Sequence, residues 1–489
     1  MKNKFLVFIV LFIGCSNTHK EYTIQEFMDI TSYGGSSFSH DERSILIRSD
    51  ESGVNNAFEI DLNTFDLKQL TFSDSNSISP ISYFPNDKRF LFRSDQGGNE
   101  IWHIYLYNLD GSTIDLTPGK KSRSLFLKWA NDKKSFFFSS NKRNPKYMDL
   151  YEMNIESFKS TLVFKNDAAL NVGDISKNKR YLALSKTYTR NNSDLYLYNF
   201  DNQRLTKILF EEADVNHSSA GFSIDSETLY FVTDLDSEFR YLKKYSIKSG
   251  KVELVQKEDW DIGANYFSDN GKYRITAINK DSQTEIKILD TSSGKHLKLP
   301  KMPSGNISSV NISKSESLIS FYHGSSQSPN NLYFYKIGSR KPRRLTTSMN
   351  PLIDQKHLGK AKVVRYSSFD GLEIPAIYYK PPQANSNNKV SAIVRVHGGP
   401  GGQARVGYRA STQYLVNNGY AVLDINNRGS SGYGKTFQTL DDQAHGKGDL
   451  DDCVAAIDWL KSQDHIDGEN IGILGGSYGG YMVMAAMTF

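Results

Sequence analysis

The chain has 489 residues, of which 59 are Lys or Arg and 54 are Asp or Glu, giving a formal net charge of +5. This excess is too small to indicate a nucleic-acid partner, which strongly basic surfaces bind. Only two cysteines occur, Cys15 and Cys453, so the composition excludes a small disulfide-rich scaffold. No Cys/His cluster has metal-ligand spacing and no phosphate-binding glycine loop is present, so we expect neither a metal nor another cofactor.

The N-terminus has the pattern of a secretion signal. Lys2 and Lys4 precede a short apolar run, residues 5–13, which is too short to remain as a membrane-spanning helix. A glycine and then Cys15 follow. A small residue directly before a cysteine is similar to the cleavage site of bacterial lipoproteins.

We therefore expect residues 1–15 to form a lipoprotein signal peptide, with Cys15 carrying the lipid, and residues 16–24 to form a linker. Lipid chains would anchor the protein to a membrane of the bacterial cell envelope without a transmembrane helix. Ser16 beside the lipidated residue favours the outer membrane. The alternative is an ordinary secretory signal followed by an incidental cysteine.

A repeat with a period near 45 residues runs through the middle of the chain. Each copy has an apolar residue, then Ser, Pro or Asn, then a polar turn before a strand, and successive copies are 46, 46, 45, 47, 45 and 45 residues apart. Seven such copies are typical of a β-propeller with seven four-stranded blades, whereas unrelated hairpins would not keep a constant period. The copies are Phe38-Ser39, Phe84-Pro85, Ala130-Asn131, Ile175-Ser176, Phe222-Ser223, Phe267-Ser268 and Ile312-Ser313.

Several blades also close alike, with a leucine followed by a threonine. We assign residues 25–347 to the propeller and residues 348–489 to a second domain, with the boundary between residues 347 and 355. The closing threonines are Thr71, Thr117, Thr206 and Thr346.

The second domain begins with an alternation of strands and helices. Residues 363–379, 391–396 and 420–426 have the apolar, β-branched pattern of strands. A helix over residues 449–461 is expected to place Cys453 in the core. Its apolar face would comprise Leu450, Cys453, Val454, Ile457 and Leu460.

Three acidic residues, Asp449, Asp451 and Asp452, occupy the first turn of this helix. A carboxylate cluster is one pattern of a metal site. We instead interpret these residues as a solvated face, because negative charges stabilise the positive end of the helix dipole.

The most informative motif is Gly475-Gly476-Ser477-Tyr478-Gly479, at the junction of a buried strand and a helix. Gly-x-Ser-x-Gly is the nucleophile elbow of the α/β-hydrolases, in which a strained turn exposes the serine hydroxyl. Gly475 and Gly479 would let the neighbouring backbone pass closely. We predict that Ser477 is the catalytic nucleophile.

The loop over residues 397–402, His-Gly-Gly-Pro-Gly-Gly, follows one of the predicted strands. It matches the loop that supplies one backbone N–H of an oxyanion hole, while the residue after the nucleophile supplies the other. We therefore predict the N–H groups of Gly399 and Tyr478 as the donors, because backbone donors are fixed in place before charge develops. His397 is assigned a structural role in the loop.

Five motifs in this order resemble the prolyl oligopeptidase family of serine peptidases, above all its acylaminoacyl-peptidase-like and dipeptidyl-peptidase-like members. The resemblance implies a seven-bladed β-propeller over an α/β-hydrolase domain that cleaves short peptides, with the propeller limiting substrate size. The motifs are Phe369-Asp370-Gly371, His397-Gly398-Gly399-Pro400, Arg428-Gly429-Ser430-Ser431-Gly432-Tyr433-Gly434, Gly448-Asp449-Leu450-Asp451-Asp452 and Gly475-Gly476-Ser477-Tyr478-Gly479-Gly480.

In α/β-hydrolases the catalytic serine is followed along the chain by an Asp or Glu and then by a His. No such partners follow Ser477. We therefore expect an incomplete hydrolase domain, an inactive chain, and a strand over residues 471–474 at an exposed sheet edge. His445 would be the first candidate base if this chain proved active.

Three functions are consistent with these features: a peptidase forming an acyl-enzyme on Ser477, an esterase with the same fold, or a lipid-anchored propeller that only binds. The sequence specifies neither the residue preferred at the scissile bond nor an oligomeric state. The adjacent pair Glu211-Glu212 does not match the helical Glu-pair motif that grips a peptide amino terminus. Its context argues against a dipeptidyl aminopeptidase.

Overall fold

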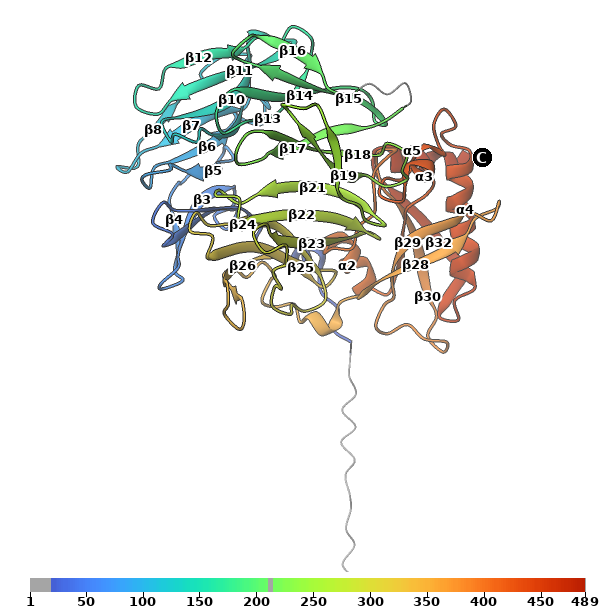
Figure 1. Ribbon diagram of the computed structural model, residues 1–489. Helices are drawn as coiled ribbons and strands as arrows, with labels where there is room; N and C mark the ends of the chain where they lie inside the picture. Colours follow the sequence, from blue (N-terminus) through green and yellow to red (C-terminus); the bar gives the residue numbers. More distant parts are fainter. Residues whose placement is uncertain (1–18, 210–213, 489) are drawn as a thin grey trace, which may run out of the picture.

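The computed structural model describes residues 19–209 and 214–488. These residues form seven small β-sheets arranged in a ring and a separate domain built on a five-stranded sheet (Figure 1). The predicted fold class, a seven-bladed β-propeller followed by a partial α/β-hydrolase domain, is confirmed. Cys15 and the signal peptide over residues 1–15 lie outside the described residues.

Each blade is built from consecutive strands. Blade 1 comprises β1 (Tyr33–Phe38), β2 (Ser44–Ser49), β3 (Asn56–Asp61) and β4 (Leu67–Gln69). Blade 2 comprises β5 (Ser79–Tyr83), β6 (Phe90–Ser94), β7 (His103–Tyr107) and β8 (Thr113–Asp115). Blade 3 comprises β9 (Ser124–Trp129), β10 (Ser135–Asn144), β11 (Tyr147–Asn154) and β12 (Ser160–Phe164). Blade 4 comprises β13 (Asn171–Ile175), β14 (Tyr181–Thr189), β15 (Asn192–Asn199) and β16 (Arg204–Lys207).

The remaining three blades continue in the same way. Blade 5 comprises β17 (His217–Phe222), β18 (Thr228–Thr233), β19 (Tyr241–Ser246) and β20 (Val252–Gln256). Blade 6 has three described strands, β21 (Asp261–Phe267), β22 (Tyr273–Lys280) and β23 (Gln283–Asp290). Blade 7 comprises β24 (Asn306–Ile312), β25 (Leu318–Ser325), β26 (Ser328–Lys336) and β27 (Arg343–Arg344).

The repeat seen in the sequence marks the turn between the first and second strands of each blade. In five blades the marker residue is a serine whose Oγ accepts a hydrogen bond from the backbone N–H five residues later. This bond closes the turn locally and so explains why a serine recurs there. The bonds run from the N–H groups of Ser44, Tyr181, Thr228, Tyr273 and Leu318 to Ser39, Ser176, Ser223, Ser268 and Ser313, at 2.9–3.3 Å.

Apolar side chains of neighbouring blades pack against each other all the way round the ring. The first and last blades meet in one such cluster, which joins Ile47 of blade 1 with Tyr322 and Leu332 of blade 7. Hydrogen bonds from Tyr322 Oη to the carbonyl of Gly35 (2.7 Å) and between Ser320 and Ser36 (3.1 Å) join the same two blades. The ring is therefore closed by side-chain packing between two separately formed blades.

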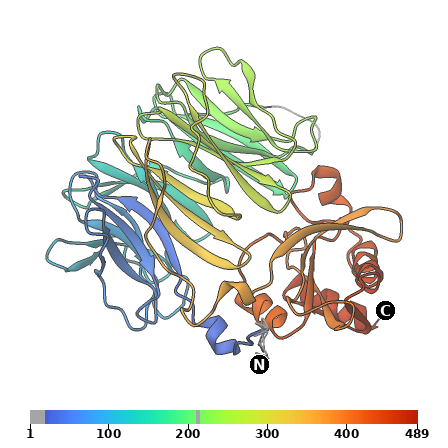
Figure 2. The same cartoon turned by 90° about the horizontal axis from the view of Figure 1, so that it is seen from below.

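The second domain has the strand order β28-β29-β31-β30-β32. β30 pairs in parallel with both β31 and β32, and helices cover both faces (Figure 2). β28 and β32 lie at the two edges of this sheet, and Leu474 within β32 is 44% exposed. The strands are β28 (Ala361–Ser367), β29 (Glu373–Tyr379), β30 (Val390–Val396), β31 (Ala421–Ile425) and β32 (Ile466–Gly475).

Five α-helices and one 3-10 helix occur in the described residues. α2 packs against one face of the sheet, and α4 and α5 against the other. The helices are α1 (Ile24–Met28), η1 (Gln355–His357), α2 (Ala410–Asn417), α3 (Lys435–Thr439), α4 (Gly448–Lys461) and α5 (Tyr478–Thr488).

Residues 19–28, which the sequence pattern divided between a linker and the first blade, pack against the hydrolase domain. Phe27 of α1 is fully buried, and its ring meets that of Tyr414 in α2. The chain then enters the propeller beside the point where it later leaves, because the N–H of Thr31 donates to the carbonyl of Ser348 (2.9 Å). The two connections between the domains therefore run side by side.

Candidate active site

Ser477 lies in the sharp turn between β32 and α5. Its φ angle is +55°, in the left-handed region that residues other than glycine rarely occupy. This strained backbone is the geometry of a nucleophile elbow, which holds the hydroxyl clear of the flanking strand and helix. The carbonyl of Ser477 accepts hydrogen bonds from the N–H groups of Gly480 (2.9 Å) and Tyr481 (3.2 Å), which tie the turn to α5.

Close backbone contacts require both elbow glycines. A Cβ atom on Gly479 would collide with the carbonyl oxygen of Val396, and one on Gly475 would collide with the backbone of Gly479. Rotating a side chain relieves neither collision, because the partners are backbone atoms. A Cβ atom on Gly476 would meet nothing within 4 Å. Close packing therefore requires glycine at positions 475 and 479 but not at position 476.

The glycine loop after β30 lies against the elbow. A Cβ atom on Gly398 would be 3.2 Å from Cβ and 3.7 Å from Oγ of Ser477. Gly399 follows directly, and Tyr478 is the first residue of α5, where N–H groups have no acceptor within the helix. The structure thus brings the two predicted motifs together, and the N–H groups of Gly399 and Tyr478 remain the predicted oxyanion donors.

His397 holds the shape of this loop. Its ring is buried, with Nδ1 2.8 Å from the carbonyl oxygen of Gly398 and Nε2 2.9 Å from Oγ of Ser430. Burial lowers the pKa of His397, so the ring is neutral near pH 7. Both ring nitrogens have partners other than Ser477, in keeping with a structural role.

Asp449 positions the residue that follows the nucleophile. The Tyr478 hydroxyl donates a short hydrogen bond to Oδ2 of Asp449. Burial and this carboxylate raise the pKa of Tyr478, so its hydroxyl stays protonated as the donor. The other Asp449 oxygen accepts from the backbone N–H groups of Lys447 (2.9 Å) and Leu450 (3.1 Å). Helix α4 therefore fixes the start of α5.

The interpretation of the acidic turn as a solvated face is wrong for two of its three residues. Asp449 is 1% exposed and Asp452 is fully buried, whereas Asp451 is exposed. Val454, predicted on the apolar face, is 52% exposed instead. The helix faces the interior with two carboxylates because each finds several hydrogen-bond donors there.

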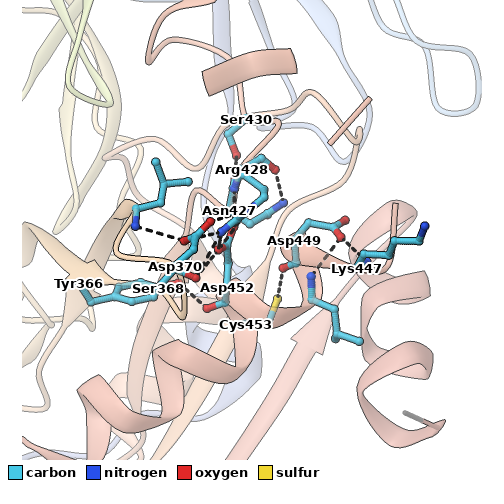
Figure 3. A network of polar contacts seen from close by, with 12 residues as sticks. Tyr366, Ser368, Asp370, Asn427, Arg428, Ser430, Lys447, Asp449, Asp452 and Cys453 are labelled. Atoms are coloured by element: carbon cyan, nitrogen blue, oxygen red, sulfur yellow. Dashed lines mark hydrogen bonds and ion pairs between the residues drawn. The ribbon is translucent and has the colours of Figure 1, made fainter. Parts of the chain in front are cut away.

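Arg428 supplies most of the donors around Asp452 (Figure 3). Its backbone N–H, Nε and Nη2 all donate to this carboxylate, at 2.8–3.2 Å, and Ser368 Oγ adds a bond of 2.6 Å. The guanidinium also binds Asp370 at 3.0 Å and 3.1 Å. Three of the quoted motifs therefore meet in one structural network that fixes the loop after β31 to α4.

The described residues place no histidine in hydrogen-bond contact with Ser477. His445, the candidate base given by the sequence, packs its ring edge-on against that of Tyr478, with centroids 5.4 Å apart. Its Nε2 lies 3.5 Å from Asp441, too far for a good hydrogen bond. His445 is thus adjacent to the elbow without being coupled to the nucleophile.

The propeller reaches the same region from the opposite side. Arg190, between β14 and β15, donates to Asp441 (2.9 Å) and Asp442 (2.7 Å) of the hydrolase domain. Its guanidinium lies so close to Gly401 that a Cβ atom there would collide with it. A propeller side chain therefore borders the glycine loop next to Ser477.

Across the described ranges, no three His, Cys, Asp or Glu side chains are grouped in a way that could hold a metal ion. Cys453 is buried, and its thiol donates to the carbonyl of Asp449, which confirms its place in the core. None of the helices in the described part of the chain has the length and hydropathy needed to cross a membrane.

An elbow serine beside a glycine loop, in a chain that also carries a propeller, is the arrangement found in α/β-type serine hydrolases with a propeller domain. A family model described as the prolyl oligopeptidase N-terminal β-propeller domain matches residues 43–347, and one for the prolyl oligopeptidase family matches residues 406–489. The chain therefore belongs to the prolyl oligopeptidase family, whose members are serine peptidases.

Individual relatives agree with this assignment. Dipeptidyl aminopeptidase BIII of Pseudoxanthomonas mexicana is 28% identical over 83% of this chain and 60% of its own length. Prolyl endopeptidase of Elizabethkingia meningoseptica is 24% identical over 91% of this chain and 64% of its own length. A solved acylaminoacyl peptidase shares the fold with a TM-score of 0.70 at 20% identity, covering 96% of this chain and 77% of that one. The chain thus spans less than two thirds of the length of these two curated relatives.

Proposed function

We propose that the protein is a serine peptidase in which Ser477 attacks the carbonyl of a short peptide and forms an acyl-enzyme. The observation that carries this proposal is the elbow itself. Ser477 has a left-handed backbone that the two flanking glycines permit, and the glycine loop lies against it. In such a site the N–H groups of Gly399 and Tyr478 would stabilise the oxyanion, and Asp449 would hold Tyr478 in place.

A histidine oriented by a carboxylate would accept the proton of Ser477 and later pass it to the leaving amine. No described residue is coupled to Ser477 in this way, so we propose that the described residues alone are inactive. In this proposal the histidine that acts as base lies outside residues 19–209 and 214–488.

The propeller would limit the size of the substrate. Contacts such as Arg190 with Asp441 and Glu238 with Thr436 hold the ring against the hydrolase domain. A peptide must then pass the ring or the seam between the domains, whereas a folded protein is excluded by shape.

Three other functions remain candidates. An esterase would use the same nucleophile and oxyanion donors. A dipeptidyl aminopeptidase is favoured by the name of the Pseudoxanthomonas relative, against the earlier interpretation of Glu211-Glu212. Both glutamates lie outside the described residues. A lipid-anchored propeller that only binds peptides is the remaining alternative.

We also propose that lipid on Cys15 anchors the protein in the bacterial cell envelope, with the outer membrane as its destination. The support is the sequence pattern over residues 1–15 alone.

The test of the peptidase uses protein purified from its native cell, so that any polypeptide that completes the site is present. We expect Ser477-dependent cleavage of acyl-peptide p-nitroanilides, little turnover of p-nitrophenyl acetate, and no digestion of folded globular proteins. Ser477→Ala is the control. Ester turnover without peptide turnover would favour the esterase, and cleavage only of substrates with a free amino terminus would favour the dipeptidyl aminopeptidase.

A further inference from the structure

A pocket of about 320 Å³ opens between the first three blades of the propeller. Two arginines line it, Arg48 of β2 and Arg93 of β6. None of the residues of the described chain that line it is an Asp or a Glu. The other lining residues are Gly34, Gly35, Ser79, Pro80, Ile81, Ser124, Leu125 and Phe126. We call this the arginine pocket.

The two arginines are exceptions to the blade repeat. They occupy equivalent positions in the second strand of their blades. In each blade the last residue of the first strand pairs with a residue of the second strand, and the arginine lies three residues after that partner. The other five blades have Ser139, Ser185, Val232, Ala277 and Tyr322 at this position. A propeller blade therefore does not need an arginine there, and packing alone gives no reason for two in adjacent blades.

Arg48 is held in place without a counter-ion among the described residues. A Cβ atom on Gly34 would lie 2.8 Å from Nη2 of Arg48, so the glycine makes room for the guanidinium. Nε of Arg48 is buried and has no hydrogen-bond partner among the described residues. Arg93 stacks over the ring of Trp102, at 5.3 Å from its centroid, and makes no ion pair in the described chain. The buried Nε of Arg48 without an acceptor is unfavourable, and Arg93 adds a second positive charge at the same pocket, so the pocket is suited to an anion.

The arginine pocket lies at the end of the propeller that faces the hydrolase domain. Arg190 follows β14 and contacts that domain, so the end of β14 and the start of the antiparallel strand β13 face it. By the blade repeat, the starts of β1, β5 and β9 lie at the same end. Gly34, Ser79 and Ser124 lie at or next to these starts, so the pocket is on the side of the ring that faces the domain carrying Ser477.

We propose that the arginine pocket binds the carboxylate of a peptide, with Arg48 and Arg93 as the charged partners; this rests on the proposed peptidase function. The side chains of Ile81 and Phe126 line the same pocket. An apolar residue that carries the carboxylate suits this mixture of charge and apolar surface. The C-terminal carboxylate of a peptide that ends in such a residue meets both requirements.

The experiment measures binding to the full chain carrying Ser477→Ala, so that cleavage does not interfere. Isothermal titration calorimetry compares acetyl-Ala-Ala-Phe, which has a free carboxylate, with its C-terminal amide. We expect the acid to bind about tenfold more tightly or better, the size of a charge-assisted hydrogen bond. Adding Arg48→Gln or Arg93→Gln should bring the acid to within about threefold of the amide. Arg204→Gln, which removes an exposed propeller arginine outside the pocket, should leave the preference unchanged.

A third probe, acetyl-Ala-Glu-Phe-amide, distinguishes the two sources of carboxylate. Tight binding that depends on Arg48 and Arg93 would assign the pocket to an acidic side chain. Arg93 is exposed, so Arg93→Gln decides the matter if Arg48→Gln fails to fold. Equal binding of acid and amide, or a preference that survives Arg93→Gln, would overturn the proposal. If the peptidase proposal alone were wrong, native protein would show no Ser477-dependent cleavage while the binding preference remained.

Discussion

Replacing Asp452 with alanine tests whether the Arg428 network holds the loop after β31. The fully buried carboxylate accepts from the backbone N–H and the guanidinium of Arg428 and from the Ser368 hydroxyl. Breaking a buried pair costs about 3–5 kcal/mol, because one charge is left without its partner. In the variant Arg428 still pairs with Asp370. We therefore expect a cost at the lower end of this range, a loss of about 3 kcal/mol in the local stability of α4.

Hydrogen exchange read by mass spectrometry measures this loss directly. A change of about 3 kcal/mol makes amide exchange in α4 roughly 100-fold faster. Asp451→Ala is the matched control, since Asp451 is exposed in the same turn and contributes only to the helix dipole, about 0.3–1 kcal/mol. Peptides from the propeller should exchange as before. If amide exchange rates in α4 differed by no more than about twofold between the two variants, the Arg428 network would not contribute the predicted stability.

Three further outcomes are expected. Gly479→Ala should lower Tm by about 4–8 °C, because overpacking against the backbone of Val396 costs roughly 2 kcal/mol, whereas Gly472→Ala, which meets nothing within 4 Å, should leave Tm nearly unchanged. A fluorophosphonate probe should label Ser477 of the recombinant 489-residue chain no more than it labels a Ser477→Ala control, because no histidine in the described residues is coupled to it. Strong labelling would contradict this and make His445 the first residue to replace. Mass spectrometry of membrane-extracted protein should find a diacylated or triacylated Cys15 at the mature N-terminus, and an unmodified start at a later residue would exclude the lipid anchor.

Features that depend on residues close in sequence could be predicted. The blade period was visible because each marker serine bonds a backbone group five residues away. The elbow was visible because Gly475 and Gly479 approach each other closely across the single turn that holds Ser477. The interactions that define these motifs are local in sequence, so a single sequence was sufficient to find them.

Features that depend on distant partners could not be predicted. Asp449 and Asp452 look like a solvated helix start, and their burial is explained by distant donors, Tyr478 for the first and Arg428 with Ser368 for the second. Likewise, nothing local shows that Phe27 belongs with α2 and not with the first blade. The sequence did point to both residues, since Arg428 and Asp452 lie in motifs quoted for the family. Only the three-dimensional structure shows that they pair with each other.

The adjacent connections at Thr31 and Ser348 determine how the two domains could separate. Two crossings joined by a hydrogen bond act as one pivot, so the propeller cannot lift evenly away from the hydrolase sheet. Rotation about this point leaves α1 and α2 nearly still and moves the far rim most, where Arg190 meets Asp441 and Asp442 beside α3 (Figure 1). A gap between the domains would thus be widest at the rim opposite the two connections. Arg190 lies at that rim, next to the glycine loop.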